Sequence, residues 1–254
     1  LGDVYKRQRH IIMKKTIVIT GASRGIGKAI AIELAGKDTN IVINCVNNVD
    51  KLNEVKSIIE EKGSVCETFI GDMGNYSDVQ KMFDMCLQRF GQVDVLINNA
   101  GISVVGLFQD MGENEWHRIC NTNIDSVFNC CHFAVKDMMK RHCGKIINIS
   151  SVWGLYGASC EVAYSATKGA VNSFTKALAK ELAPSGIQVN AVACGAIDTE
   201  MNGHLSDDDK ASLAEEIPAG RFGSPQEVAK LVKSLSGMNS YLTGQIITLD
   251  GGWI

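Results

Sequence analysis

The stretch TIVITGASRGIGKAI, residues 16–30, decides the fold class. It opens with five residues that favour a buried strand, and a glycine-rich turn and a helical pattern follow directly. Glycine lets backbone N–H groups approach a phosphate closely, and a helix that begins there presents its positive dipole end to the same anion. This order predicts a dinucleotide-binding turn. Its expected cofactor contacts are Gly21, Ser23, Arg24, Gly25, Ile26 and Gly27.

The rest of the chain repeats this alternation of strand and helix. We expect strands at 16–20, 40–45, 65–72, 93–99, 145–150, 187–193 and 245–252, and helices at 25–37, 50–62, 77–90, 113–141, 162–183 and 225–236. Apolar strands that alternate with helices are typical of a parallel sheet covered on both faces. The sequence therefore predicts one Rossmann-like α/β domain over residues 13–254, a doubly wound parallel sheet of about seven strands with a substrate loop near 195–216.

Composition excludes several classes of protein. The chain has 254 residues and a formal net charge of -3, which gives no basic field for nucleic acid. No apolar run reaches about 18 residues, so we expect no membrane span. Nine cysteines without CxxC spacing predict reduced thiols in the cytoplasm and no metal site. Residues 1–12 resemble translated adapter sequence, and we expect them to lie outside the fold, with the native start at Met13.

The end of the second predicted strand bears on the cofactor. Residues 43–48 read INCVNN, without the acid that would bind the ribose 2′-hydroxyl of NAD. Arg24 in the glycine turn can instead bind a 2′-phosphate, so the pattern predicts NADPH rather than NADH. Asp72 either accepts a hydrogen bond from the adenine or caps its own loop. The expected contacts with the adenosine half are Asn44, Asn47, Asp72 and Met73.

A tyrosine and a lysine share one face of the helix predicted at 162–183. Tyr164 and Lys168 stand four positions apart, which makes their side chains neighbours on a helix. Ser151 ends a strand and can donate a hydrogen bond to a carbonyl oxygen. Each of these features also arises by chance, so the set has to be weighed together.

The ordered set resembles a known family. TGASRGIG (20–27), Asp72, NNAG (98–101), Asn123, Ser151, Tyr164-x-x-x-Lys168 and VACGAIDTEM (192–201) closely resemble a short-chain dehydrogenase/reductase. RFGSPQEVA (221–229) and YLTGQIITLDGG (241–252) resemble the 3-oxoacyl-[acyl-carrier-protein] reductases of that family. The resemblance implies NADPH-dependent reduction of a 3-oxoacyl thioester, linked to acyl carrier protein or CoA, in bacterial fatty-acid synthesis. It also implies a cytoplasmic homotetramer.

The resemblance assigns roles to single residues. Tyr164 would be the general acid, Lys168 would lower the pKa of its phenol, and Ser151 would orient the carbonyl. Asn123 would hold a water that links Lys168 to solvent, or would serve only as an amide between helices. The nicotinamide half would contact Asn99, Ala100, Gly101, Tyr164, Lys168, Gly195, Ile197 and Thr199. The substrate pocket would be formed by Ser151, Trp153, Tyr156 and Cys194, the last where many relatives have proline.

The substrate itself stays open at this level. A basic patch that includes Lys140, Arg141, His142 and Lys145 is expected near the pocket mouth, where it would dock an acidic carrier protein. GLYGASCEVAYSATKGA (154–170) also resembles a subgroup that reduces a 5-aminopentanone modification on elongation factor P. Hydroxysteroid and other small-ketone dehydrogenases share the same motifs. A cofactor-binding scaffold without turnover is the alternative outside enzymes.

Overall fold

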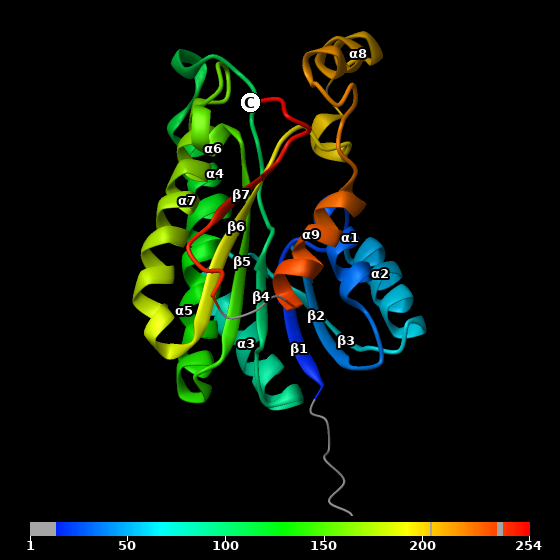
Figure 1. Ribbon diagram of the computed structural model, residues 1–254, viewed down its shortest axis with the longest axis vertical. Helices are drawn as coiled ribbons and strands as arrows, with labels where there is room; N and C mark the ends of the chain where they lie inside the picture. Colours follow the sequence, from blue (N-terminus) through cyan, green and yellow to red (C-terminus); the bar gives the residue numbers. More distant parts are fainter. Residues whose placement is uncertain (1–13, 204, 238–240) are drawn as a thin grey trace, which may run out of the picture.

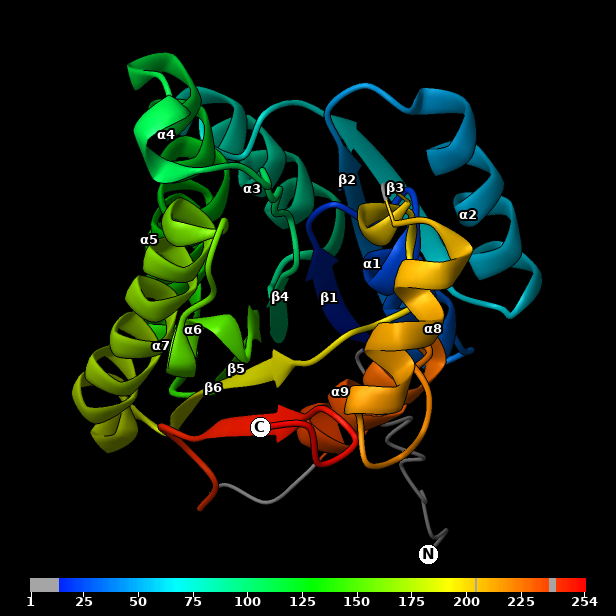
Figure 2. The same cartoon turned by 90° about the horizontal axis from the view of Figure 1, so that it is seen from above.

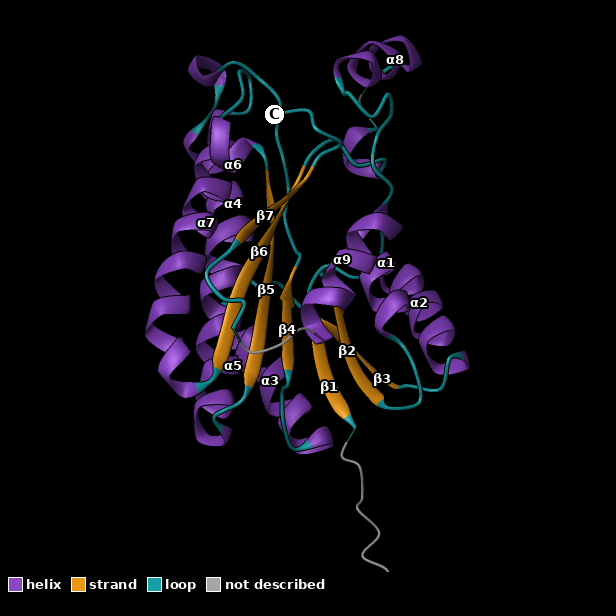
Figure 3. Cartoon of the chain, viewed as in Figure 1, coloured by secondary structure: helices purple, strands orange, loops and turns teal. Residues whose placement is uncertain are grey.

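The alternating pattern folds into one parallel sheet. The computed structural model describes residues 14–203, 205–237 and 241–254, so the predicted extension 1–12 and the start at Met13 lie outside the described residues. The strand order is β3-β2-β1-β4-β5-β6-β7, all parallel (Figures 1 and 3). The strands are β1 (Lys15–Ile19), β2 (Thr39–Cys45), β3 (Val65–Ile70), β4 (Val95–Asn98), β5 (Gly144–Ser151), β6 (Ile187–Cys194) and β7 (Ile246–Leu249). This confirms the predicted fold class.

Helices cover both faces of the sheet. They are α1 (Gly25–Leu34), α2 (Val49–Glu61), α3 (Tyr76–Phe90), α4 (Glu113–Cys120), α5 (Ser126–Arg141), α6 (Trp153–Tyr156), α7 (Val162–Leu182), α8 (Asp207–Glu216) and α9 (Pro225–Gly237). Figure 2 shows α1, α2 and α9 on one side and α3, α5 and α7 on the other. The direction in which strands are added reverses between β1 and β4. Ligands of such sheets bind at the carboxyl ends of the strands beside that reversal.

Strand residues alternate between two apolar layers. Ile17 and Ile19 of β1 pack with α1, α2 and α9, whereas Val18 packs in the other layer with α3, α5 and α7. Successive side chains of a strand point to opposite faces, so a strand covered on both faces must be apolar throughout. Burial of each such side chain contributes about 1.5–3 kcal/mol relative to exposure. This burial fixes the register of β1 in the centre of the sheet.

The helix predicted over 113–141 is not continuous. α4 and α5 are separated by one π-helical turn, Asn121–Asp125. Such turns accommodate an extra residue and often mark functional sites. The turn contains Asn123, whose side chain is bonded to neighbouring elements, and this provides a physical reason for the break. The short helix α6 was not predicted either.

The cysteines and the helices bear on two further expectations. All nine cysteines are free thiols, and six of them are buried. Within the described part of the chain, no helix combines the length and the apolar character that crossing a membrane requires.

Candidate active site

The glycine turn is held against the end of β4. Gly21 has a φ of +64°, and a Cβ at that position would lie 2.9 Å from the Cα of Ala100. The Nδ2 of Asn99 donates to the carbonyl oxygens of Thr20 and Gly21, at 3.0 Å each. The hydroxyl of Thr20 accepts from the backbone N–H groups of Asn99 and Ala100. Asn99 and Ala100 therefore lock the turn, and Thr20 is a supporting residue that the sequence reasoning missed.

The turn fits a pyrophosphate. A Cβ on Gly27 would lie 2.3 Å from the carbonyl oxygen of Gly21, so this approach requires glycine. The first turn of α1 receives no side-chain cap from Arg24, so its N–H groups have no side-chain acceptor at the N-cap. Open donors at a helix N-terminus beside crowded glycines are the arrangement that a dinucleotide phosphate needs. Ser23 and Ile26 lie in the same turn. The residues present therefore fit the cofactor.

The residues expected at the adenosine half differ in what they offer. Asn44 is buried, and its Nδ2 donates to the carbonyls of Cys45, Phe69 and Gly71. It braces the ends of β2 and β3, so its cofactor contact stays a prediction. Asn47 is exposed and open to a ligand. Sequence spacing alone does not separate these two asparagines.

Asp72 and Met73 follow β3. The carboxylate of Asp72 accepts from the N–H of Gly74 at 2.9 Å and from Asn121 at 3.2 Å, so the expected loop cap is present. The side chain of Met73 packs in the apolar layer with α3 and α5, which leaves only its backbone for a ligand. The predicted contact of Met73 with the cofactor would therefore use its backbone, and it stays a prediction.

Arg24 belongs to an ion cluster that the sequence did not predict. Its guanidinium lies 2.8 Å from the carboxylate of Glu200, and the ammonium of Lys51 lies 2.9 Å from the same carboxylate. Glu200 directly follows Thr199. The methyl group of Thr199 lies 3.6 Å from the position that a Cβ on Gly25 would occupy. The segment after β6 thus crosses the glycine turn. Two cations gathered on one carboxylate provide a suitable place for a phosphate.

Ser151, Tyr164 and Lys168 come together at the carboxyl end of β5. The Ser151 hydroxyl lies close enough to the Tyr164 phenol to act on its ionisation, and its Oγ accepts from the N–H of Trp153 at 3.2 Å. The ammonium of Lys168 lies 5.6 Å from the centre of the Tyr164 ring and donates to the carbonyl of Ile149 at 2.9 Å. Lys168 is buried, while Tyr164 keeps part of its surface open. Two elements, β5 and α7, thus position the predicted catalytic side chains.

Burial governs the titration of this pair. Desolvation raises the pKa of Tyr164 above its usual value, although the hydrogen bond from Ser151 acts in the opposite direction. Desolvation lowers the pKa of Lys168 to about 8. The expectation that Lys168 lowers the pKa of Tyr164 is wrong for this structure, because the ammonium faces the ring and desolvation of the phenolate dominates. A protonated phenol is the form that a proton donor requires.

Asn123 joins the π-helical turn to two neighbours. Its Oδ1 accepts from the N–H of Ile102, and its Nδ2 donates to the carbonyl of Ile102 and to the hydroxyl of Thr167. A Cβ on Gly101 would lie 3.4 Å from both the Asn123 amide and the Lys168 ammonium. Asn123 therefore has the inter-element role left open by the sequence, and it lies beside Lys168. Its role in holding a water stays a prediction.

Close packing of α6 on α7 also supports Lys168. A Cβ on Gly154 would lie 2.6 Å from the backbone carbonyl carbon of Lys168. Asn172 donates to the carbonyl of Gly154 and accepts from the hydroxyl of Ser150. Gly154 and Asn172 are residues that the sequence reasoning missed. The sequence signal that could have indicated this close packing is the pair of small residues Gly154 and Ala158, four positions apart in GLYGA.

The predicted pocket residues have different surroundings. Trp153 packs against Trp253 with ring centres 4.9 Å apart, which brings the chain after β7 over the site. Tyr156 is 62% exposed and lies at the rim rather than in a wall. Cys194 is buried, and burial raises its pKa to about 12, so the thiol is neutral. Trp253 is the unforeseen member.

The segment after β6 lines the approach to the glycine turn. A Cβ on Gly195 would meet Asp250 at 2.7 Å, which ties the end of β6 to the end of β7. Ile197 is buried and pairs with Gly223 in an isolated bridge. Contacts of Gly195, Ile197 and Thr199 with a nicotinamide stay predictions.

The predicted basic docking patch is in the wrong place. α5 ends at Arg141 and β5 begins at Gly144, so these residues lie at the amino end of the sheet (Figure 1). Arg141 is bound to Asp94 and Asp137 at 2.9 Å each. Ser151 and Tyr164 lie at the opposite end of β5. Lys140, Arg141, His142 and Lys145 therefore cannot surround the mouth of the site.

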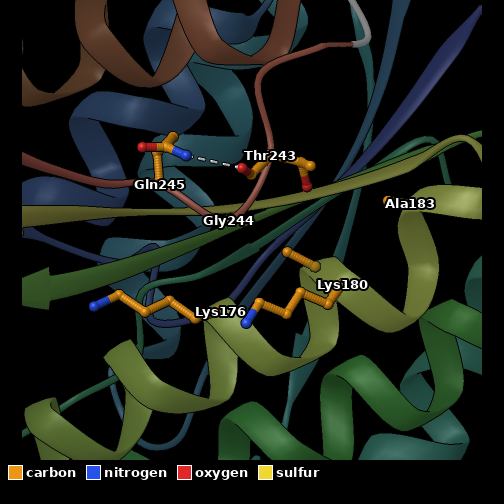
Figure 4. Close-up of a pocket in the computed structure, with 7 residues that line it drawn as sticks. Lys176, Lys180, Ala183, Thr243, Gly244 and Gln245 are labelled. Carbon is orange, nitrogen blue, oxygen red and sulfur yellow. Dashed lines mark hydrogen bonds between the residues drawn. The ribbon is translucent and has the colours of Figure 1, made fainter.

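One cavity of the described residues lies away from these groups. Its volume is about 370 Å³, and Figure 4 shows it between α7 and the segment before β7. It is lined by Lys176, Ala179, Lys180, Ala183, Thr243, Gly244 and Gln245. Lys176 follows Lys168 by two helical turns, or roughly 12 Å along α7. The chemistry of the side chains, rather than the size of a cavity, locates the candidate site.

Comparison with known proteins identifies the family. The family model described as short chain dehydrogenase matches residues 15–210. The chain belongs to the short-chain dehydrogenase family. The match spans the glycine turn, β5 and the Tyr164–Lys168 helix, and it confirms an oxidoreductase of this family.

Individual short-chain dehydrogenases are similar over nearly their whole length. The 3-oxoacyl-[acyl-carrier-protein] reductase FabG of Staphylococcus epidermidis is 40% identical over 241 residues, which cover 94% of this chain and 99% of that protein. The FabG of Chlamydia trachomatis is 37% identical, with coverage of 95% and 98%. A solved structure titled "ElxO with NADP Bound" has a TM-score of 0.87 and 34% identity, with coverage of 95% and 99%.

Proposed function

We propose that this short-chain dehydrogenase reduces a carbonyl to an alcohol with NADPH, and that its leading substrate is a 3-oxoacyl thioester of fatty-acid synthesis. The observation that carries the proposal is the meeting of Ser151, Tyr164 and Lys168 beside the glycine turn. The Staphylococcus relatives, which are 40% identical to this chain, bear the name 3-oxoacyl-[acyl-carrier-protein] reductase. Acyl carrier protein or CoA would carry the acyl chain.

The mechanism follows from the protonation states. The nicotinamide, when bound, supplies the hydride. Ser151 Oγ donates to the carbonyl oxygen, and Tyr164 gives its proton to that oxygen as negative charge develops there. The raised pKa keeps the phenol protonated at neutral pH, which is the form that can give a proton. Lys168, with a pKa of about 8, can restore that proton from bulk water.

Cofactor choice rests on charge. Arg24 and Lys51 provide two cations near the glycine turn, and β2 ends without an acid at Cys45. A 2′-phosphate would replace the carboxylate of Glu200 between these cations. The solved relative at 34% identity was determined with NADP, which supports the same choice. NADH remains the alternative to be measured.

A second candidate substrate is a ketone that carries an ammonium group. The specific observation is Glu161, a carboxylate at the entrance of the site that acts on Tyr164. An aminoketone such as the 5-aminopentanone modification of elongation factor P carries a positive ammonium group, which is opposite in charge to this carboxylate. The elongation factor itself would then be the partner in place of acyl carrier protein.

Assembly and location belong to the same proposal. We infer a cytoplasmic homotetramer in which α5 and α7 meet neighbouring copies. Tyr76, Phe128, His132 and Phe133 form an aromatic row on α3 and α5, and Phe128 is 50% exposed. Exposed aromatic groups of this kind are typical of subunit contacts. Sedimentation of the full chain tests the inference.

The first test is turnover of acetoacetyl-CoA with NADPH and with NADH. Oxidation of NADPH is expected, with a lower rate for NADH, and Tyr164→Phe should lose at least about a hundredfold in kcat. Binding of NADPH to that variant, measured by fluorescence, should be retained. A parent protein that binds NADPH but reduces no carbonyl compound would instead be a scaffold.

A further inference from the structure

A carboxylate stands at the entrance of the candidate site. Glu161 precedes α7 directly, three positions before Tyr164, so one helical turn separates the two side chains. The hydroxyl of Ser103 donates to Oε2 of Glu161 at 2.6 Å. Ser103 follows the NNAG segment after β4, while Glu161 opens the catalytic helix. The hydrogen bond therefore spans the two sides of the entrance.

A second bond fixes the same two segments. The N–H of Gly106 donates to the carbonyl of Cys160 at 2.8 Å. Cys160 has a φ of +62°, which side chains other than glycine adopt at a cost. The bonds from Gly106 and Ser103 hold this conformation in place. Glu161 is thus a positioned carboxylate rather than a mobile surface group.

The ion pairs of the described residues bear on the charge of Glu161. In residues 14–203, 205–237 and 241–254, no lysine, arginine or histidine forms an ion pair with it. Its field reaches Tyr164 and opposes ionisation of that phenol. The cations of the predicted docking patch lie at the other end of the sheet. Glu161 is therefore a negative charge that acts on Tyr164 from this side of the site.

The segments next to this carboxylate carry exposed apolar side chains. Gly106 lies beside Cys160, and α6 and the start of α7 complete the rim. The exposed apolar residues of these segments are Val105, Leu107, Phe108, Leu155, Tyr156 and Val162. An apolar body with a positive group matches this surface.

We propose that Glu161 is a specificity-determining residue that selects substrates by the charge they carry close to the reacting carbonyl. The inference rests on the proposed carbonyl reduction and adds the criterion by which substrates are ranked. A positive group near the carbonyl is favoured, a neutral chain is accepted and a carboxylate is rejected. A 3-oxoacyl thioester is neutral near its carbonyl, so it passes the criterion.

Three thioesters of acetoacetate test the proposal. They are acetoacetylthiocholine, its neutral isostere with carbon in place of the quaternary nitrogen, and the analogue that ends in a carboxylate. We expect kcat/KM to fall about fivefold to tenfold from cation to neutral compound and again from neutral compound to anion. Where turnover is slow, inhibition of acetoacetyl-CoA reduction should give the same order. The difference should lie in KM.

Glu161→Gln is the matched variant. Glutamine keeps the size of the side chain and an oxygen that accepts from Ser103, so only the charge is removed. The ratio of kcat/KM for the cation to kcat/KM for the neutral isostere should approach one. Glu161→Asp retains the charge and should retain the preference. Glu61→Gln, an exposed residue at the end of α2, is the control and should leave all ratios unchanged.

The outcomes separate this inference from the proposed function. Equal kcat/KM values for the three thioesters, or a preference that persists in Glu161→Gln, overturn the role of Glu161 while carbonyl reduction stands. Failure of the parent protein to reduce any of them or acetoacetyl-CoA, at a normal melting temperature, overturns the proposed function itself. If Glu161→Gln does not fold, loss of the charge preference in the Glu161→Asp variant overturns the inference, because its charge is intact.

Discussion

Replacement of Lys168 by methionine should stabilise the protein and abolish turnover. Lys168 is buried, and burial lowers its pKa from 10.5 to about 8. Below pH 8 the folded protein must hold the ammonium in a poorly solvated place. The difference in pKa corresponds to about 3 kcal/mol of lost stability at pH 7. Methionine is similar in length and removes this charge.

The gain in stability is partly offset by the loss of one hydrogen bond. The ammonium donates to the carbonyl of Ile149 at 2.9 Å, and leaving that oxygen unpaired costs about 1 kcal/mol. A net gain of about 2 kcal/mol at pH 7 remains. For a chain of this length it should raise the melting temperature by about 4–8 °C. Urea unfolding of both proteins measures it directly.

The pH dependence provides the decisive check. The unfolded chain binds more protons at this lysine than the folded protein does between pH 8 and pH 10.5, so the stability of the parent rises with pH across that window. The advantage of Lys168→Met should therefore largely vanish by pH 10. A variant that is less stable than the parent at pH 7, or an advantage that is the same at both pH values, would refute the reasoning. Lys176→Met, on the exposed side of α7, is the control.

Three further predictions concern the cofactor. Glu200→Gln should lower the KM for NADPH by about threefold and leave that for NADH unchanged, because the 2′-phosphate no longer competes with a carboxylate for Arg24; steady-state kinetics with both cofactors decide it. Gly27→Ala should abolish NADPH binding as followed by fluorescence, since its Cβ would lie 2.3 Å from the Gly21 carbonyl; retained affinity would show that the turn relaxes. Cys45→Asp, at the end of β2, should reverse the ratio of kcat/KM for NADPH and NADH, and an unchanged ratio would place the ribose elsewhere.

Local patterns in the sequence were sufficient for the fold. Unbroken apolar strands such as β1 require cover on both faces, and alternation with helices allows only a parallel sheet. The glycine turn follows because Gly21 and Gly27 occupy positions that no other residue fits. Tyr164 and Lys168 were placed on one helix face by their spacing alone.

Interactions between distant segments were not accessible in this way. The π-helical turn at Asn123 depends on contacts with Ile102 and Thr167, and no local preference encodes it. The basic patch failed because neighbours in sequence around Arg141 turn at the amino end of the sheet, away from the chemistry. A group of basic residues in the sequence does not by itself show which end of the sheet it occupies. That depends on whether the residues precede or follow the neighbouring strand, and here they precede β5.

The sequence by itself determined the architecture and predicted the cofactor turn and the residues proposed for proton transfer, because each depends on short-range periodicity or on a steric need of glycine. Only the tertiary structure decided the electrostatics of the entrance. Burial reversed the expected shift in the pKa of Tyr164, and the bond between Ser103 and Glu161 joined segments 58 positions apart. Solvation and the sign of a local field depend on everything packed around a group, and this is set when the chain folds.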